Sequence, residues 1–336
     1  MSVVMIPGVI LAIPAGILID RHGVRLIGSI SAVLAALGSL ITAMAGSFNM
    51  ALVGRFILGI GGAFITTVTP TIIPQWFAQE ELGRATGIYG ISMPLATVAA
   101  FPLSSMLMLT YGWRHSIYLS MAIGILNIIF FTFLVKEGPL KRGHGGGRGV
   151  RLALTNVEVW KVGIVWLFFN AATLSFTTWS PQILQDIGMD PISASFMASA
   201  IMLAGIPFVP VIGLISDRMR KRKPLMVIGC TVMTGTFILL TYTSGNALVA
   251  SIIILGIAAS MIPPIVMALP PEILGPSSAA IGFGVVAICL NIGIAIGPPF
   301  VGLLLDITGS PSLSFLAMGF FSAIGGITAY SLRTEP

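Results

Sequence analysis

Gly16-Ile17-Leu18-Ile19-Asp20-Arg21-His22-Gly23-Val24-Arg25 is a short charged stretch between two long apolar runs. A related stretch, Gly213-Leu214-Ile215-Ser216-Asp217-Arg218-Met219-Arg220, also lies between two apolar runs. The two aspartates, at positions 20 and 217, are 197 residues apart. An apolar helix that ends in Gly-x-x-x-Asp-Arg and occurs twice predicts a duplicated membrane protein, since transporter folds are commonly built from internal repeats.

The composition excludes a water-soluble particle. The chain has 336 residues, of which 56% are hydrophobic and 8% are charged, whereas soluble domains carry about 25% charged residues. So few charges cannot cover the surface of a soluble protein of this length, and the lipid bilayer must surround most of the chain. Cys230 and Cys289 both lie in apolar runs without metal-ligand spacing, so we expect no disulfide, no metal site and no cofactor.

The apolar runs predict eleven membrane-spanning helices. A span needs about 20 mostly apolar residues. Short polar turns separate most neighbouring runs, and one long polar segment divides the set. The predicted spans are residues 3–19, 24–45, 50–73, 85–109, 116–135, 159–181, 194–215, 225–242, 247–269, 279–305 and 313–332.

The polar segment 136–158 divides the chain into an N-terminal bundle of five spans (residues 1–135) and a C-terminal bundle of six (residues 159–336). Its glycine-rich part, residues 143–149, has the composition of a flexible linker. With alternating spans, one side of the membrane receives nearly all basic residues and the other little beyond Arg114. The excess of Lys and Arg on cytoplasmic loops therefore predicts that both Asp-Arg turns, the linker and the C-terminus are cytoplasmic.

The repeat extends beyond the two charged turns. Gly112 and Gly309, which precede the last span of each half, are also 197 residues apart. Residues 85–90 resemble residues 280–284, and prolines cluster near the inner ends of corresponding spans in both halves. The two halves therefore share one plan, and the first half lacks a span that would precede residue 3.

The chain resembles the major facilitator superfamily of secondary transporters. The resemblance rests on Gly16-x-Leu18-x-Asp20-Arg21-x-Gly23-x-Arg25 and on the half-copy Gly213-x-x-x-Asp217-Arg218-x-Arg220. That family has twelve spans, and its Asp-Arg turn joins the second and third. The resemblance therefore implies an all-α polytopic membrane protein of two pseudo-symmetric helix bundles, with eleven spans instead of twelve because the first family span is absent.

The resemblance also implies a central cavity and alternating access by rocking of the two halves. In the family, the Asp-Arg turn locks the halves together on the cytoplasmic side in the outward-open state. The alternative is that these side chains only anchor the topology. The predicted gate residues are Gly16, Asp20, Arg21, Gly23, Arg25, Gly213, Asp217 and Arg218.

Arg55 is the clearest charged residue inside a predicted span, and no Asp or Glu lies near the middle of any span. A buried charge costs roughly 2.5–3.5 kcal/mol on insertion scales, so such a residue is a functional candidate. Arg55 resembles the Arg-x-x-x-Gly pattern of the family's cavity-lining fourth span. It is predicted to contact an anion or to take part in proton coupling, and the alternative is an arginine that snorkels to the outer surface.

A polar stripe marks the span 159–181. Trp166, Asn170, Thr173 and Thr177 fall at helical spacing on one face, in a helix that corresponds to the family's cavity-lining seventh span. These side chains either contact a small polar solute or hold helices together through polar contacts. Tyr89 and Asn291, on corresponding spans of the two halves, are further candidates.

These features predict a secondary active transporter that moves a small polar, anionic solute across the cytoplasmic membrane. The alternative is a non-transporting remnant or sensor module of the same fold. An enzyme is not expected, because the sequence has no clusters of His, Cys or carboxylates and all three histidines lie in predicted loops. The expected partners are a small-molecule substrate, a coupling proton or ion and the lipid bilayer, with no nucleic acid, and we expect a monomer.

Overall fold

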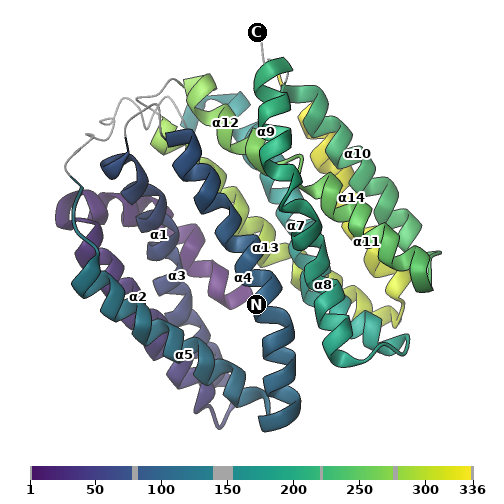
Figure 1. The fold of residues 1–336 in the computed structure, drawn as a ribbon, viewed down its shortest axis with the longest axis horizontal. Helices are drawn as coiled ribbons and strands as arrows, with labels where there is room; N and C mark the ends of the chain where they lie inside the picture. Colours follow the sequence, from purple (N-terminus) through teal and green to yellow (C-terminus); the bar gives the residue numbers. More distant parts are fainter. Residues whose placement is uncertain (1, 78–81, 139–153, 220–221, 275–278, 334–336) are drawn as a thin grey trace. The chain divides into compact units, whose positions relative to one another are not determined.

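The computed structural model describes residues 2–77, 82–138, 154–219, 222–274 and 279–333. These residues form helices and no strands (Figure 1). Ten helical stretches in this part of the chain are long and apolar enough to cross a membrane, and a shorter apolar stretch covers Val3–Ala12. The predicted all-helical membrane fold is confirmed.

Contacts between Cα atoms group the chain into two units. The first comprises Met1–Ser92 and Leu103–His144, and the second comprises Met93–Pro102 and Gly145–Pro336. The helices up to the polar segment are α1 (Ser2–His22), α2 (Val24–Ala43), α3 (Phe48–Trp76), α4 (Leu82–Tyr111), α5 (Trp113–Ile129) and the π-helical η1 (Phe130–Leu134). The later helices are α7 (Val157–Asp186), α8 (Pro191–Gly205), α9 (Phe208–Met219), α10 (Arg222–Leu240), α11 (Gly245–Ala259), α12 (Pro263–Leu274), α13 (Ala279–Thr308) and α14 (Pro311–Tyr330).

Two predicted spans are interrupted. The span 194–215 is divided between α8 and α9, and the span 247–269 between α11 and α12. The breaks fall immediately before Phe208 and Pro263. Pro207 and Pro263 have no backbone N–H, so neither can continue the hydrogen bonds of the helix before it. Pro263 is also the first residue of α12, a position that proline favours.

Small residues bring α2 and α3 together in the first unit. A Cβ added at Gly38 would overlap the backbone of Gly54 and Leu58, and one added at Gly54 would overlap Thr42 and Gly38. The Ser31 hydroxyl donates a hydrogen bond to the Gly61 carbonyl oxygen across the same interface, at 2.7 Å. Close approach through small residues is a common way for helices to associate in a bilayer, where the hydrophobic effect does not drive them together.

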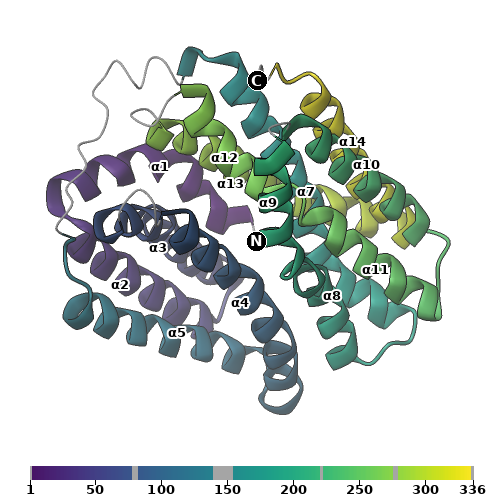
Figure 2. The same cartoon turned by 45° about the horizontal axis from the view of Figure 1, so that its top comes forward.

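The end of α5 packs on the start of α2, and these two helices run side by side in both views (Figures 1 and 2). Phe131 in η1 is 5% exposed and fills the space over Gly28, where any Cβ would overlap its ring. The π-helical turn therefore positions the end of this span directly beside the turn that joins α1 and α2.

The second unit is built around α7, which packs against α13 and α14. Gly293 and Gly297 of α13 lie against the backbone of Leu167 and Ala171 of α7, where a Cβ would overlap. Large buried side chains fill the rest of this unit, and α10 and α14 lie alongside each other (Figure 2). The most enclosed of them include Phe176, Phe237, Met233, Leu255 and Ile262.

Candidate functional site

Arg55 lies in α3, which begins after Ser47, whose hydroxyl accepts a hydrogen bond from the Met50 N–H at 3.3 Å. At 1.5 Å per residue, Arg55 is about 10 Å along the helix axis from Phe48. The side chain is exposed and has no hydrogen bond or ion pair within the described part of the chain. Arg55 is therefore a cation within the apolar helix α3 that no described acidic residue neutralises.

The structure distinguishes Arg55 from Arg114. The Arg114 guanidinium donates to the carbonyl oxygens of Ala43 and Ala45 at 3.2 and 3.1 Å and lies over the Trp113 ring, 4.6 Å from its centroid. These are the free carbonyls at the end of α2, which a cation stabilises. Arg114 therefore has a structural task at a helix end, and Arg55 has none of these contacts.

The polar stripe of α7 lies in the interior of the second unit. Asn170, Thr173 and Thr177 are each 3% exposed or less. Each bonds to a backbone carbonyl of its own helix: Asn170 Nδ2 to Trp166 O at 2.7 Å, Thr173 Oγ1 to Phe169 O at 2.8 Å and Thr177 Oγ1 to Thr173 O at 3.2 Å. The polar atoms are thus satisfied within α7 rather than by links to a neighbouring helix.

Trp166 lies at one end of this stripe and takes part in an aromatic stack. Its ring stacks on Phe169 with a centroid distance of 5.1 Å and an interplanar angle of 12°. Both rings belong to the main apolar cluster of the second unit. The arrangement provides a flat apolar surface next to the Asn170 carboxamide, which is the combination that small-molecule sites use.

Ser180 extends the stripe and was missed in the sequence. It follows Thr177 by three residues on the same face of α7, so an extension of the spacing would have found it. Its side chain is completely buried, and its hydroxyl has no hydrogen-bond partner in the described residues. Buried polar atoms are usually paired, and this hydroxyl is one of two buried side-chain atoms without a partner in the described residues.

The remaining span candidates are less enclosed. Tyr89 in α4 is 38% exposed. Asn291 in α13 is half-buried, and its Nδ2 donates to the Ala287 carbonyl oxygen of the same helix at 2.8 Å. Neither residue forms a side-chain contact with Arg55 or with the α7 stripe among the interactions described, so their proposed role stays a prediction.

In the first charged turn, the structure describes the side chains of Leu18, Ile19 and His22 and the residues from Gly23 onward. Gly23 separates α1 from α2 with φ +84°, a conformation that favours glycine. The Arg25 guanidinium donates to the Thr132 carbonyl oxygen through Nε, at 3.0 Å, and through Nη2. The side chains of Asp20 and Arg21, and Gly16, lie outside the described part of the structure, as do those of Asp217 and Arg218.

An open pocket of about 370 Å³ lies at this turn. It is lined by His22, Arg25, Leu26, Ser29, Thr132 and Glu137. The Glu137 carboxylate accepts a hydrogen bond from the Arg25 backbone N–H at 3.1 Å, in the first turn of α2. A carboxylate is favoured at that end of a helix because the backbone N–H groups there are unpaired and carry partial positive charge.

The second charged turn is fastened by an ion pair. Arg222, at the start of α10, donates through Nε to both carboxylate oxygens of Glu272 in α12, at 2.9 and 2.8 Å. Its Nη1 also donates to the buried Ser216 hydroxyl at 3.0 Å. The planar guanidinium thus joins the start of α10 to α9 and α12, which a lysine could not do with the same geometry.

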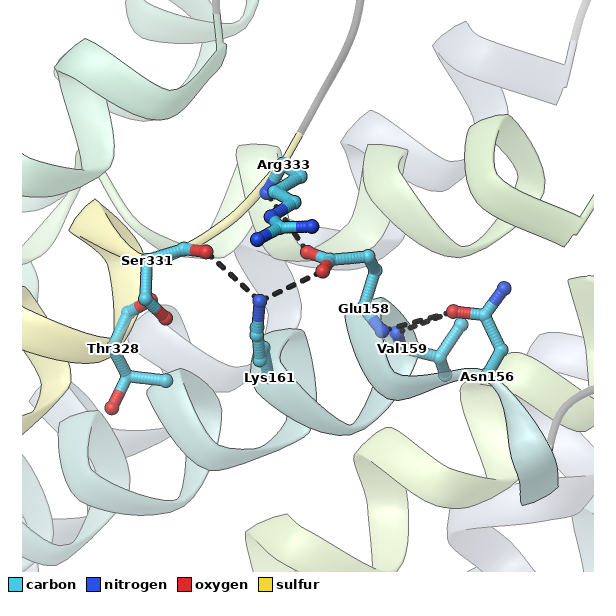
Figure 3. A network of polar contacts seen from close by, with 7 residues as sticks. All are labelled: Asn156, Glu158, Val159, Lys161, Thr328, Ser331 and Arg333. Atoms are coloured by element: carbon cyan, nitrogen blue, oxygen red, sulfur yellow. Dashed lines mark hydrogen bonds and ion pairs between the residues drawn. The ribbon is translucent and has the colours of Figure 1, made fainter.

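A third polar group fastens the start of α7 to the end of α14 (Figure 3). The Asn156 side chain caps α7, and Glu158 accepts from Lys161 Nζ at 2.7 Å and from the Arg333 backbone N–H at 2.9 Å. Lys161 Nζ also donates to the Ser331 carbonyl oxygen at 2.9 Å. These contacts close two helix ends without a ligand, so the group is structural.

Among the described residues, no group of three or more His, Cys, Asp or Glu side chains is placed to hold a metal ion. Both cysteines are buried, each 2% exposed. The polar groups described above are the buried α7 stripe and the contacts of Arg114, Arg25, Arg222 and Lys161 at helix ends.

Comparisons with known proteins identify related transporters. The chain is 26% identical over 273 residues to monocarboxylate transporter 13 of Bos taurus, which covers 77% of this chain and 62% of that protein. It is 22% identical over 263 residues to a putative tartrate transporter of Agrobacterium vitis, covering 70% of this chain and 59% of that protein. The chain thus spans about three fifths of the length of both relatives.

Among solved structures, the transporter FucP in the outward conformation is similar in fold. The TM-score is 0.70, the sequence identity is 16%, and the match covers 99% of this chain and 90% of that chain. The family model of the Major Facilitator Superfamily matches residues 1–190 and 180–336. The family match and the relatives named as transporters together point to a transporter rather than an enzyme. The chain belongs to the Major Facilitator Superfamily, and its long apolar helices are those of a multi-pass membrane protein.

Proposed function

We propose that the chain moves a small anionic solute, first of all a carboxylate, across the cell membrane by alternating access. The observation that carries the proposal is Arg55, a cation inside a span whose side chain has no ion-pair partner among the described residues. An intramembrane charge without a partner is expensive, and an anionic solute would supply the missing charge. Relatives named for monocarboxylate and tartrate support the choice of a carboxylate.

In this proposal the α7 stripe is the candidate set of solute contacts on the second unit, considered separately from Arg55 on the first. Trp166 gives an apolar wall, Asn170 and Thr173 give hydrogen bonds, and Ser180 offers an unpaired hydroxyl further along the same face. Tyr89 and Asn291 are secondary candidates. The bundles 1–135 and 159–336, joined by the segment 136–158, would rock about this site, with a proton or another ion as the coupling partner.

The gate in this proposal is the pair of charged turns, with the C-terminus and the segment 136–158 on the cytoplasmic side. Gly16, Asp20, Arg21, Gly23 and Arg25 form the first turn. Gly213, Asp217 and Arg218 form the second. The fixed contacts of Arg25 and Arg222 support a mechanical role for the turns, because both arginines join separate helices.

The test is uptake by purified protein in liposomes. Lactate and tartrate serve as carboxylates, nitrate as an anion without a carboxylate, and a neutral sugar as the uncharged control. Arg55→Gln should abolish or strongly reduce carboxylate uptake, and Arg55→Lys should retain part of it because the charge is kept. Arg114→Gln is the matched control: it removes an arginine that caps a helix, so it should lower thermal stability while the KM stays unchanged. Normal uptake by Arg55→Gln would overturn the role of Arg55.

A further inference from the structure

The repeat offset of 197 residues also relates residues next to the two charged turns. Arg25 corresponds to Arg222, and Pro74-Gln75 corresponds to Pro271-Glu272. The arginines begin α2 and α10, and the Pro-Gln and Pro-Glu pairs lie near the ends of α3 and α12. The two halves therefore have the same arginine at the start of corresponding helices, but only the second half has an acid at the position of Glu272.

In the second unit this acid is the partner of the arginine. The Arg222 guanidinium binds both oxygens of Glu272, which joins the start of α10 to α12. A bidentate pair of this kind fixes both distance and orientation.

In the first unit the corresponding residue is neutral, and its partner differs. The Gln75 Oε1 accepts a hydrogen bond from the Gly138 backbone N–H at 3.2 Å. Gly138 follows Glu137, and the Glu137 carboxylate accepts from the Arg25 N–H at 3.1 Å. The acid at this turn is thus Glu137, which follows α5 and η1, and not a residue near the end of α3.

The turn has space for this carboxylate because residue 23 is glycine. A Cβ at Gly23 would overlap Glu137 Oε1, and φ of +84° would strain any other residue. The Arg25 guanidinium points at the Thr132 carbonyl oxygen of the same segment. Ser29 adds contacts to the Arg25 carbonyl oxygen at 2.9 Å and to Thr132 Oγ1 at 3.3 Å.

We propose that Glu137 is the first half's replacement for Glu272, a positioning residue that fastens the charged turn after α1 to the end of α5. The acids then act differently in the two halves: Glu272 of α12 binds the Arg222 guanidinium, whereas Glu137, three residues after η1, accepts from the Arg25 backbone N–H while the Arg25 guanidinium donates to Thr132. Glu137 and Gly138 are the first residues after the α5–η1 span for which such contacts are described, and they join this stretch to the turn and to Gln75 near the end of α3. The inference rests on the proposed gating role of the turn only for its effect on transport.

The test restores the acid to the position that it has in the second half. The variants are Glu137→Gln, Gln75→Glu and the double variant, each in the full chain with Ser29→Cys as an isosteric reporter of opening at the turn. The native cysteines are buried, so the reaction of a membrane-impermeant maleimide with the reporter gives the readout. In Glu137→Gln, the maleimide should react with the reporter cysteine several-fold faster than in the parent. In the double variant, the reaction rate should return towards that of the parent.

Controls separate this contact from general loosening. Glu158→Gln breaks another helix-end contact and should leave the reporter rate unchanged, as should Glu272→Gln, which acts on the other turn. Uptake should change in Vmax rather than in KM for Glu137→Gln, since the residue does not touch the solute. Parent-like labelling of Glu137→Gln, or no recovery in the double variant, would overturn the proposal. If the labelling pattern holds while no solute is transported, the contact stands and the proposed function fails.

Discussion

Trp179 of α7 donates its indole N–H to the Pro298 carbonyl oxygen of α13 at 2.7 Å, and its ring covers Gly302 one turn further along. The contact joins the two helices that pack most extensively in the second unit. It also makes the small size of residue 302 a structural requirement, because a side chain there would occupy the place of the indole.

We expect Gly302→Ala to destabilise the protein because its Cβ would overlap the Trp179 ring. Displacing the ring breaks the hydrogen bond to Pro298 and forces the helices apart, and overpacking of this kind costs about 1–3 kcal/mol. Gly284→Ala in the same helix is the control, since no atom lies within 4 Å of a Cβ there. Thermal unfolding in detergent should show a lower Tm only for Gly302→Ala; equal Tm values would contradict the packing.

In the first unit, Gly59→Ala should lower stability because the new Cβ would meet the Val4 carbonyl oxygen of α1, which is backbone and cannot rotate away. Gly62→Ala, three residues later in α3, meets nothing within 4 Å. Alanine is a better helix former than glycine by roughly 0.5–1 kcal/mol, so Gly62→Ala should be neutral or stabilising. Opposite signs of the two Tm changes are expected, and a similar loss in both variants would show that α1 does not pack on Gly59.

The proposed orientation predicts the accessibility of two exposed sites. Tyr242 is 85% exposed after α10, and Val157 is 64% exposed at the start of α7. With the basic residues in the cytoplasm, Tyr242→Cys should react with an impermeant maleimide added to intact cells. Val157→Cys should react only in inverted vesicles. The parent, whose Cys230 and Cys289 are buried, supplies the background, and the reverse labelling pattern would refute the orientation.

Asp190 predicts a pH effect at the start of α8. Hydrogen bonds from Ser193, together with the Ile192 N–H, lower the pKa of the Asp190 carboxyl below its ordinary value. A lowered pKa in the folded state stabilises the protein above the unfolded-state pKa, and this contribution is lost as pH falls through the folded-state pKa. The Tm difference between the parent and Asp190→Asn should therefore be present at pH 7 and shrink in acid. A Tm difference between the parent and Asp190→Asn that does not change with pH would contradict this prediction.

The membrane fold could be read from the sequence because the bilayer imposes a strong rule: long apolar runs become spans, and glycine or polar turns separate them. Gly23, Gly112 and Gly309, which the sequence places between runs, all have positive φ. The breaks before Phe208 and Pro263 were not predicted, because proline is tolerated in many membrane helices and only packing decides whether the helix stops.

The site was less predictable. Arg55 was identifiable because a charge inside an apolar run is rare. Glu137 gave no signal, since it lies among polar residues after a span and its partner Arg25 is 112 positions away. Only the folded chain brings the two together. The predicted gate residues Asp20 and Asp217 keep their status as predictions, with side chains outside the described structure.

The polar side chains of α7 bond to the backbone of α7 itself. Asn170, Thr173, Ser175 and Thr177 all donate to carbonyl oxygens one turn earlier. Donor and acceptor of each of these hydrogen bonds lie in the same helix. A rotation or a shift of α7 against its neighbours therefore breaks none of these four bonds. Within the described residues, polar links from α7 to other elements lie near its two ends: Trp179 bonds to Pro298 of α13, and Glu158 and Lys161 bond to the residues that follow α14. A movement of α7 against its neighbours would therefore act on these links first.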